Sequence, residues 1–176
     1  MTNIVVHHTS RVQFLNGGLS PTPKQLQDYE MDKRGFSDIP YQFVITADGR
    51  IYQGRELKSV GAHAGEIAGN KDIKKDPDWG SIGIVLMGDF EGGTGDGPTQ
   101  AELDSRTTLV ARLMLDYQGI RAAQILKHSE VKRSGDPKAC PGKRLSPKVD
   151  ELRTGAVIKE VEDAVLALQA AATPRQ

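Results

Sequence analysis

The sequence predicts an α/β fold, a single domain over residues 1–176 in which α-helices flank a central mixed β-sheet. Short β-branched runs alternate along the chain with segments of helical periodicity, which is typical of α/β domains. An Asp48-Gly49 pair between two strand-like runs is a strong hairpin signal, so the sheet cannot be wholly parallel. The sequence has no internal repeat or proline-rich linker, and 176 residues suffice to bury one core.

The N-terminal part predicts a strand, a helix and a β-hairpin. The β-branched run 3–6 indicates a buried strand that ends at two adjacent histidines, His7 and His8. Thr22-Pro23-Lys24-Gln25 combines an N-cap, a proline at the first helical position and a capping-box partner, so a helix should run from about Pro23 to Arg34. The hairpin strands are then expected from Tyr41 to Ala47 and from Arg50 to Gln53.

The middle of the chain predicts a central strand and a long covering helix. Ser81 to Met87 is an apolar run without charge, as expected for a strand buried on both faces. It stands between the polar segment 65–80 and the glycine-rich segment 92–97, two loops that could border a cleft. Thr99 and Glu102 form a second capping box, and the apolar spacing that follows predicts a helix up to Gly119.

The last elements are a short strand and a helical region. Ile125 and Leu126 indicate a strand that leads into His128, and a C-terminal helical region is expected from about 146 to 171, divided at Gly155. Its second part should carry one apolar face, formed by Val157, Ile158, Val161, Val165 and Leu168.

Composition excludes several classes of function. The 23 basic and 23 acidic residues balance, so net charge indicates neither a nucleic-acid partner nor an anionic membrane surface. No run approaches the roughly 20 apolar residues of a membrane span, and the N-terminus lacks a recognisable export signal. Cys140 is the single cysteine, so a disulfide scaffold is excluded, and its thiol is buried, reactive or bound to a metal.

Two histidines and the cysteine offer donors for a metal. Hydrolytic zinc sites typically use three nitrogen, sulfur or oxygen ligands plus water, and His7, His128 and Cys140 could supply such a set. A structural zinc site would usually need a fourth protein ligand. A cysteine hydrolase would instead need a free thiol paired with one imidazole. Taken singly, each of these residues is more often packed or exposed than bound to a metal.

Several ordered blocks of the sequence match one family. The segment from about Asn3 to Arg144 resembles the zinc-dependent N-acetylmuramoyl-L-alanine amidase family, which includes phage lysozyme-type amidases and the peptidoglycan recognition proteins. The matching blocks are Val6-His7-His8-Thr9-Ser10, Tyr41 to Ile45, Asp48 to Arg55, His63-Ala64-Gly65, Ser81-Ile82-Gly83-Ile84, Lys127 to Val131 and Pro137-Lys138-Ala139-Cys140-Pro141-Gly142.

The resemblance implies roles for individual residues. It implies that His7, His128 and Cys140 hold zinc, which lowers the pKa of water and polarises the scissile carbonyl. It implies that His8 is not a zinc ligand but a structural residue next to one. Tyr41 would orient the attacking water or share its proton, and Lys138 would stabilise the anionic tetrahedral intermediate. His63 matches a position that lines the substrate groove, so we expect it to bind substrate.

Two positions depart from the family pattern. Some relatives carry a glutamate base directly after Ser-Ile-Gly-Ile, where this chain has Val85, so proton handling should fall on Tyr41, the zinc-bound water or both. Cys140 follows His128 by twelve positions, a longer spacing than in similar phage enzymes, with Lys132 to Asp136 as an insertion. A surface loop absorbs such an insertion at small entropic cost.

The resemblance implies an enzyme that cleaves the amide between N-acetylmuramic acid and L-alanine in bacterial peptidoglycan. A short chain of this kind is typical of a phage endolysin, a bacteriolytic protein made in the host cytoplasm and released to the cell wall by another protein. The alternatives are a non-catalytic peptidoglycan-recognition module, a cytoplasmic muropeptide-recycling amidase and an injected antibacterial effector. We expect a monomer that contacts neither nucleic acid nor the membrane interior.

Overall fold

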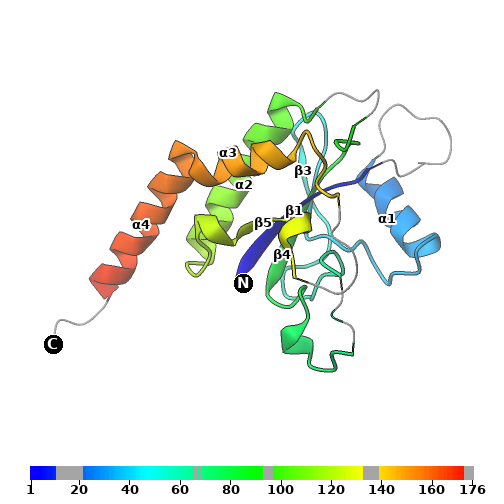
Figure 1. Cartoon of the computed structure of the whole chain (residues 1–176), viewed down its shortest axis with the longest axis horizontal. Helices are drawn as coiled ribbons and strands as arrows, with labels where there is room; N and C mark the ends of the chain where they lie inside the picture. Colours follow the sequence, from blue (N-terminus) through cyan, green and yellow to red (C-terminus); the bar gives the residue numbers. More distant parts are fainter. Residues whose placement is uncertain (11–21, 66, 68, 93–96, 133–138, 173–176) are drawn as a thin grey trace.

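The fold is a five-stranded mixed sheet with helices on both faces (Figure 1). The computed structural model describes residues 1–10, 22–65, 67, 69–92, 97–132 and 139–172. Its strands and α-helices are, in chain order, β1 (Asn3–His8), α1 (Pro23–Asp32), β2 (Phe43–Ile45), β3 (Ile51–Gln53), β4 (Ser81–Leu86), α2 (Gln100–Asp116), β5 (Ile125–Lys127), α3 (Ser146–Thr154) and α4 (Ala156–Ala172). Short 3-10 helices cover Ile73–Lys75 (η1), Ala122–Gln124 (η2) and His128–Glu130 (η3).

The sheet has the order β3-β2-β4-β1-β5. β1 pairs in parallel with β4 on one side and β5 on the other, and β2 pairs in parallel with β4. Only the hairpin pair β2 and β3 is antiparallel among these strands. The mixed sheet predicted from the Asp48-Gly49 signal is therefore confirmed.

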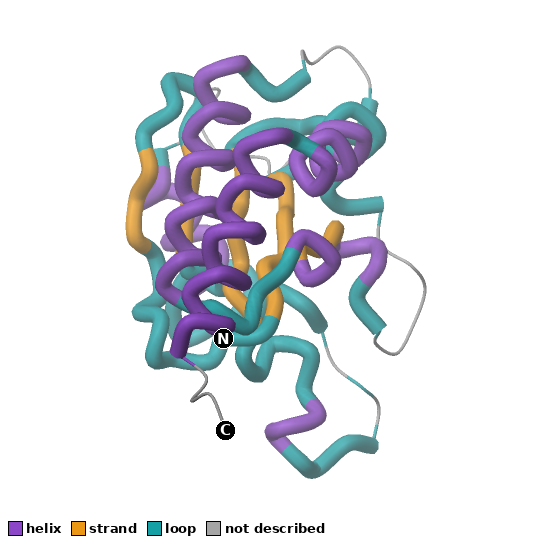
Figure 2. Tube along the Cα trace, turned by 90° about the vertical axis from the view of Figure 1, so that its left-hand side faces the viewer, coloured by secondary structure: helices purple, strands orange, loops and turns teal. Residues whose placement is uncertain are grey.

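Helices cover the two faces of the sheet unequally. α2 and α4 pack against each other and lie over one face together with α3, whereas α1 lies on the opposite side (Figures 1 and 2). Because side chains alternate along a strand, the central strands supply two apolar clusters. Ile4, Val6, Ile84 and Leu86 belong to the larger cluster, with residues of α2, α3 and α4. The smaller cluster contains Leu26, Ile39, Tyr41, Val44, Val85 and Met87.

Both predicted capping boxes form and fix the starts of their helices. The Thr22 hydroxyl accepts from the Gln25 N–H at 3.2 Å, while the Gln25 side chain accepts from the Thr22 N–H at 2.8 Å. In the same way, the Thr99 hydroxyl accepts from the Glu102 N–H at 3.1 Å, and the Glu102 carboxylate accepts from the Thr99 N–H at 2.8 Å. Each pair satisfies two backbone donors that the first helical turn leaves open.

Two details of the predicted elements are wrong. Tyr41 does not start a strand, because β2 begins at Phe43. The predicted apolar face of α4 is too wide, since Ile158 and Val165 are fully buried but Val157 and Leu168 are 48% and 57% exposed. Val157 lies about 100° around the helix from Ile158, on a side of α4 that stays exposed, and the C-terminal end of α4 extends beyond the sheet (Figure 1).

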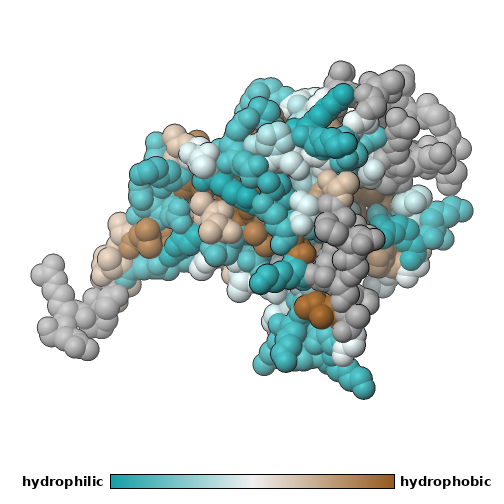
Figure 3. Space-filling model, in the orientation of Figure 1, coloured by the Kyte–Doolittle hydropathy of each residue, from teal (hydrophilic) through white to brown (hydrophobic). Residues whose placement is uncertain are grey.

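The visible surface is mainly polar. Figure 3 shows apolar residues as small separate areas, among them one on α4, within a hydrophilic surface. Among the described residues, no helix has the length and hydropathy needed to span a membrane.

Candidate metal centre

The topology of the sheet brings His7 and His128 together. β1 and β5 are adjacent and parallel, with Val6 level with Lys127, so the next residue of each strand lies at the same edge. His7 occupies that position in β1, and His128 occupies it as the first residue of η3. The centroids of their rings are 4.5 Å apart. Two residues that are far apart in the sequence thus share one end of the sheet.

A backbone contact returns Cys140 to the same place. The Ser129 N–H donates to the Cys140 carbonyl at 2.9 Å, which ties the cysteine segment to η3. Gly142 lets the chain pass close to Phe90, because a Cβ there would lie 2.4 Å from the Phe90 carbonyl carbon and its φ is +90°. A side chain at this position would therefore displace the segment that carries Cys140.

Ion pairs with residues of α3 hold η3 in place. The Arg153 guanidinium of α3 pairs with the Glu130 carboxylate and also donates to the Ile125 carbonyl. Lys127 Nζ lies 3.0 Å from Asp150 Oδ1 and 3.3 Å from Glu130 Oε1. Because Glu130 is the last residue of η3, these contacts hold the short helix whose first residue is His128.

The three predicted donors have the spacing of a zinc site. Their candidate ligand atoms all lie within 4.8 Å of one another, and His7 Nδ1 is 3.6 Å from Cys140 Sγ. Tetrahedral zinc with the usual bond lengths separates a nitrogen from a sulfur ligand by about 3.5 Å. The donor set, two imidazoles and one sulfur, is also one that zinc prefers. The residues therefore fit zinc in both chemistry and distance.

Burial sets the protonation of these donors. It lowers the pKa of His7 well below the ordinary value, and the neighbouring His63 and His128 lower it further, so the ring stays neutral with a lone pair to donate. Burial raises the pKa of the Cys140 thiol to about 12, against a lowering contribution from the His8 backbone N–H. A metal that binds there must therefore displace the thiol proton.

His8 faces the other side of β1. Its Nδ1 accepts a hydrogen bond from the Phe90 N–H at 3.0 Å, and its ring stacks on Phe90 at 6.0 Å between centroids. Its role in the structure is thus to hold the Phe90 segment. The alternation of side chains along a strand explains why only one of the two adjacent histidines reaches the candidate metal centre.

Tyr41 borders the candidate centre from the segment before β2. Its ring centroid lies 5.1 Å from that of His7 and 6.2 Å from that of His63, and the residue is 9% exposed. Burial, with a smaller contribution from Cys140, raises the pKa of the phenol. Val85 lies in the same apolar cluster as Tyr41, so β4 presents no carboxylate at the position where some relatives carry one.

His63 lies directly behind His7. Its Nδ1 is 3.1 Å from His7 Nε2, and its Nε2 is 3.4 Å from Asp78 Oδ1. Burial lowers the pKa of His63 to about 3, so the ring is neutral at physiological pH. Burial also raises the pKa of Asp78, against the backbone N–H groups of His63, Ala64 and Gly65.

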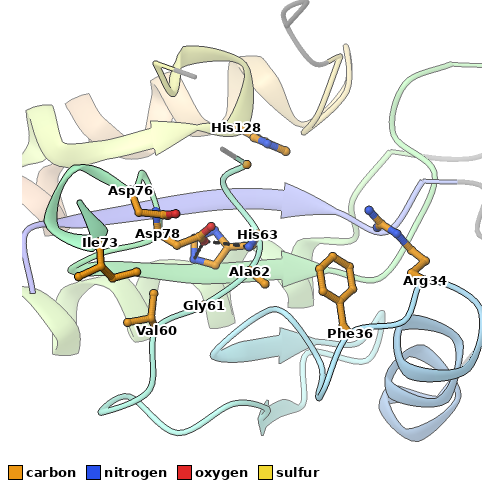
Figure 4. A pocket seen from close by; sticks show the side chains of 11 residues that line it. Arg34, Phe36, Val60, Gly61, Ala62, His63, Ile73, Asp76, Asp78 and His128 are labelled. Atoms are coloured by element: carbon orange, nitrogen blue, oxygen red, sulfur yellow. Dashed lines mark hydrogen bonds and ion pairs between the residues drawn. The ribbon is translucent and has the colours of Figure 1, made fainter. Parts of the chain in front are cut away.

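A pocket of about 490 Å³ opens beside these residues (Figure 4). His63 and His128 line it, and in the figure Asp76 and Asp78 lie on one side of His63 while Arg34 and Phe36 lie on the other. His63 thus lies beside the pocket, and its contact with substrate stays a prediction. Lys138 and most of the 132–136 insertion lie outside the described residues.

Sequence reasoning missed Asp78, Arg34 and Phe36 as neighbours of the site. Asp78 lies in a charged loop whose composition alone indicates only solvent exposure. The Asp76-Pro77-Asp78 triplet could have indicated an ordered turn, since Asp76 Oδ1 accepts from the Asp78 N–H at 2.8 Å. Nothing in the triplet indicates that it turns toward a histidine.

Comparison with known proteins identifies related sequences and folds. The family described as N-acetylmuramoyl-L-alanine amidase matches residues 1–143. Peptidoglycan-recognition protein SD from Drosophila simulans is 32% identical over 114 residues, 65% of this chain and 54% of the relative. Peptidoglycan-recognition protein 1 from Holotrichia diomphalia is 31% identical over 140 residues, 78% of this chain and 64% of the relative. The chain thus spans less than two thirds of either curated relative.

Solved structures share the fold over most of the chain. The N-acetylmuramoyl-L-alanine amidase LysC from Clostridium intestinale URNW is 27% identical with a TM-score of 0.60, over 86% of this chain and 84% of that one. Wild-type Drosophila PGRP-LB is 30% identical with a TM-score of 0.59, over 84% and 78%. A Drosophila PGRP-LB mutant in complex with tracheal cytotoxin is 29% identical, with a TM-score of 0.60, over 84% and 79%.

Proposed function

Because the chain belongs to the N-acetylmuramoyl-L-alanine amidase family, we propose that it is a zinc-dependent hydrolase that cleaves the amide between N-acetylmuramic acid and L-alanine in peptidoglycan. One observation carries this proposal: the candidate ligand atoms of His7, His128 and Cys140 lie within 4.8 Å of one another, and His128 also lines the pocket. A solved amidase of 27% identity, LysC, shares the fold.

The residues around the proposed centre have separate tasks. Zinc held by His7, His128 and Cys140 would polarise the scissile carbonyl and lower the pKa of water. Tyr41 keeps its phenolic proton at neutral pH because burial raises its pKa, so it would donate a hydrogen bond to the oxygen on which negative charge develops. Lys138 would add a positive charge at the same stage, as the family resemblance implies. Arg34 and Asp76, on opposite sides of the pocket, would contact polar groups of the substrate.

A cysteine hydrolase is the weaker alternative. A nucleophilic cysteine needs a thiol pKa lowered toward neutrality, typically by a cationic neighbour. Here burial raises the pKa of Cys140 to about 12, and the nearest imidazole, that of His7, is neutral. The same features suit a thiol that loses its proton only when a metal ion binds the sulfur.

A peptidoglycan-recognition module is the second candidate, because several relatives carry that name. The complete set of two imidazoles and one thiol favours catalysis, since recognition alone does not require it. For the cellular role we propose a phage endolysin that is made in the host cytoplasm and reaches the cell wall after release by another protein. One solved relative, LysCS from Clostridium intestinale, is described as an endolysin amidase.

The decisive experiment is digestion of intact peptidoglycan by the purified protein. The protein is assayed as purified, after treatment with a chelator, and after add-back of zinc or of magnesium, which prefers oxygen ligands. Mass spectrometry of the products should show peptides that begin with L-alanine and intact glycan strands, restored by zinc and not by magnesium. Cys140→Ser should be inactive under all conditions. Binding to peptidoglycan without cleavage by the zinc-loaded protein would establish the recognition module instead.

A further inference from the structure

The ring of His63 lies in a slot that two glycines create. A Cβ on Gly83, in the central strand β4, would lie 2.4 Å from His63 Cδ2. A Cβ on Gly61 would lie 2.6 Å from the same atom. Distances this short are not tolerated between real atoms, so any other residue at either position would displace the ring. The chain therefore holds this imidazole in one place, as close-packed interiors do.

Each nitrogen of this fixed ring faces a defined neighbour. Nδ1 lies 3.1 Å from His7 Nε2, within hydrogen-bond distance. Nε2 makes no hydrogen bond with the described residues, but Asp78 Oδ1 lies 3.4 Å from it (Figure 4). The side chain of His63 is 0% exposed and that of Asp78 is 8% exposed, so solvent competes little for these contacts. A row of Asp78, His63 and His7 therefore runs from the loop before β4 to the candidate metal centre.

Asp78 is itself fixed by backbone donors. Its Oδ1 accepts from the His63 N–H at 2.8 Å and from the Ala64 N–H at 3.0 Å. Its own N–H donates to Asp76 Oδ1 at 2.8 Å. The carboxylate thus binds the backbone of His63 and lies next to its ring, which couples the position of the loop to the position of the ring.

The hydrogen positions in this row follow from the proposed function, on which the inference rests. His7 Nδ1 is the nitrogen that faces Cys140 Sγ, so it is the nitrogen available to a metal. A neutral histidine that binds a metal through one nitrogen carries its proton on the other. The proton on His7 Nε2 then points to His63 Nδ1, which must accept it, so the proton of His63 resides on Nε2, toward Asp78.

We propose that Asp78 and His63 are positioning residues for His7: the negative charge of Asp78, close to His63 Nε2, keeps the ring proton on that nitrogen, and His63 Nδ1 accepts from His7 Nε2–H. Metal-binding histidines usually donate directly to a carboxylate, a carbonyl or water. Here a second histidine lies between the ligand and the carboxylate. The row fixes the tautomer and the ring plane of His7, so that Nδ1 faces the other two ligands.

The tautomers can be observed directly. Long-range proton–nitrogen NMR correlations on the zinc-loaded protein, labelled with ¹⁵N-histidine, distinguish the two protonated forms of each ring. We expect His7 to carry its proton on Nε2 with Nδ1 bound to metal, and His63 to carry its proton on Nε2. A proton on Nδ1 of His63 would overturn the proposal, because that nitrogen could not then accept from His7.

Zinc affinity measured by competition with a chromophoric chelator tests the carboxylate without any activity assay. Asp78→Asn keeps an oxygen that can accept from the backbone but removes the negative charge that favours the proton on His63 Nε2. We expect a loss of zinc affinity of about tenfold, and of up to about 100-fold for His63→Leu, the range found when outer partners of metal ligands are removed.

Asp72→Asn is the matched control. Asp72 lies in the same loop and caps η1, so the substitution removes the same charge without touching His63, and zinc affinity should stay within about twofold of wild type. A loss in His63→Leu alone would overturn the role of Asp78, and wild-type affinity in both variants would overturn the whole row. Failure of the wild-type protein to bind zinc would instead refute the proposed function, and this inference with it.

Discussion

At the scale of single residues, burial decides what each side chain of the site can contribute. Tyr41 lies between the rings of His7 and His63 and the apolar cluster under α1, and its phenol keeps its proton because burial raises the pKa. A protonated phenol donates hydrogen bonds and does not act as a base at neutral pH. Its expected contribution to the reaction is therefore stabilisation of developing negative charge.

Removing only the hydroxyl tests this role. Tyr41→Phe keeps the ring packing and should lower kcat by about 100- to 1000-fold, the usual cost of losing one donor to an oxyanion. Zinc affinity should stay unchanged, since the hydroxyl is not a metal ligand. The measurement is steady-state hydrolysis of a soluble muropeptide. Tyr52→Phe, on the exposed strand β3, is the matched control and should keep wild-type kcat. Equal rates in the two variants would refute the role of the Tyr41 hydroxyl.

At the scale of secondary structure, the sequence predicts elements that depend on local signals. The two capping boxes and the Asp48-Gly49 hairpin are encoded within a few residues, and all three form as predicted. The exposed side of α4 was not predictable, because periodicity shows that Val157 and Ile158 are apolar but not how wide the contact with α2 is. That width depends on where α2 ends and how far α4 extends, which are properties of the packed molecule.

The two sides of α4 should respond differently to truncation of their side chains. Ile158→Ala removes a fully buried side chain from the main core and should lower the free energy of unfolding by about 2–5 kcal/mol. Val157→Ala, the neighbouring residue with a side chain half exposed, should change it by about 0.5 kcal/mol or less. Urea denaturation followed by circular dichroism measures both. Equal losses would mean that Ile158 is not buried in the main core.

The start of α2 predicts a dependence of stability on pH. Glu102 is 1% exposed, and burial raises its pKa above the ordinary 4.5 despite its hydrogen bonds to Thr99. As pH rises above about 4.5, the unfolded chain therefore releases this proton before the folded protein does, so ionisation of Glu102 lowers the stability of the fold.

Glu102→Gln keeps the capping-box geometry and removes the charge. The variant should gain stability relative to wild type as pH rises from 4.5 to 7, and the difference between the two proteins should shrink toward pH 4. Urea denaturation at a series of pH values measures this. A difference that stays constant over the whole range would show that the carboxyl of Glu102 does not titrate with a raised pKa.

At the scale of the whole molecule, the candidate centre exists because of topology. His7, His128 and Cys140 come together only when β5 pairs with β1 and Ser129 binds the Cys140 carbonyl. Spacing in the sequence cannot show this, so the three donors were predicted from the pattern of a family and not from periodicity. The row behind His7 was not predicted, because Asp78 enters it through a loop without regular structure.

Zinc should stabilise the entire fold if it binds at this centre. A ligand present at 100 times its Kd adds about 2.7 kcal/mol to the free energy of unfolding. For a domain of this size that corresponds to a rise in Tm of about 5–10 °C. Differential scanning calorimetry with and without zinc measures the shift, and Cys140→Ser should remove it. A shift that persists in this variant would place the bound zinc elsewhere.

The adjacent histidines of β1 also bear on how related sequences are aligned. All residues from Ile4 to His8 are buried, so this strand lacks the alternation of apolar and polar residues that normally shows which side chains share a face. An alignment shifted by one position at the His7-His8 pair would still match apolar residues with apolar residues and a histidine with a histidine. It would, however, assign the metal to His8, which binds the Phe90 N–H. The residues on either side of the run fix which histidine is which. The Thr2 N–H donates to the Gly80 carbonyl and the Thr9 N–H donates to the Leu86 carbonyl. Alignments of this family are therefore best anchored on the contacts of flanking residues, because the information that distinguishes the two histidines is not contained in the motif itself.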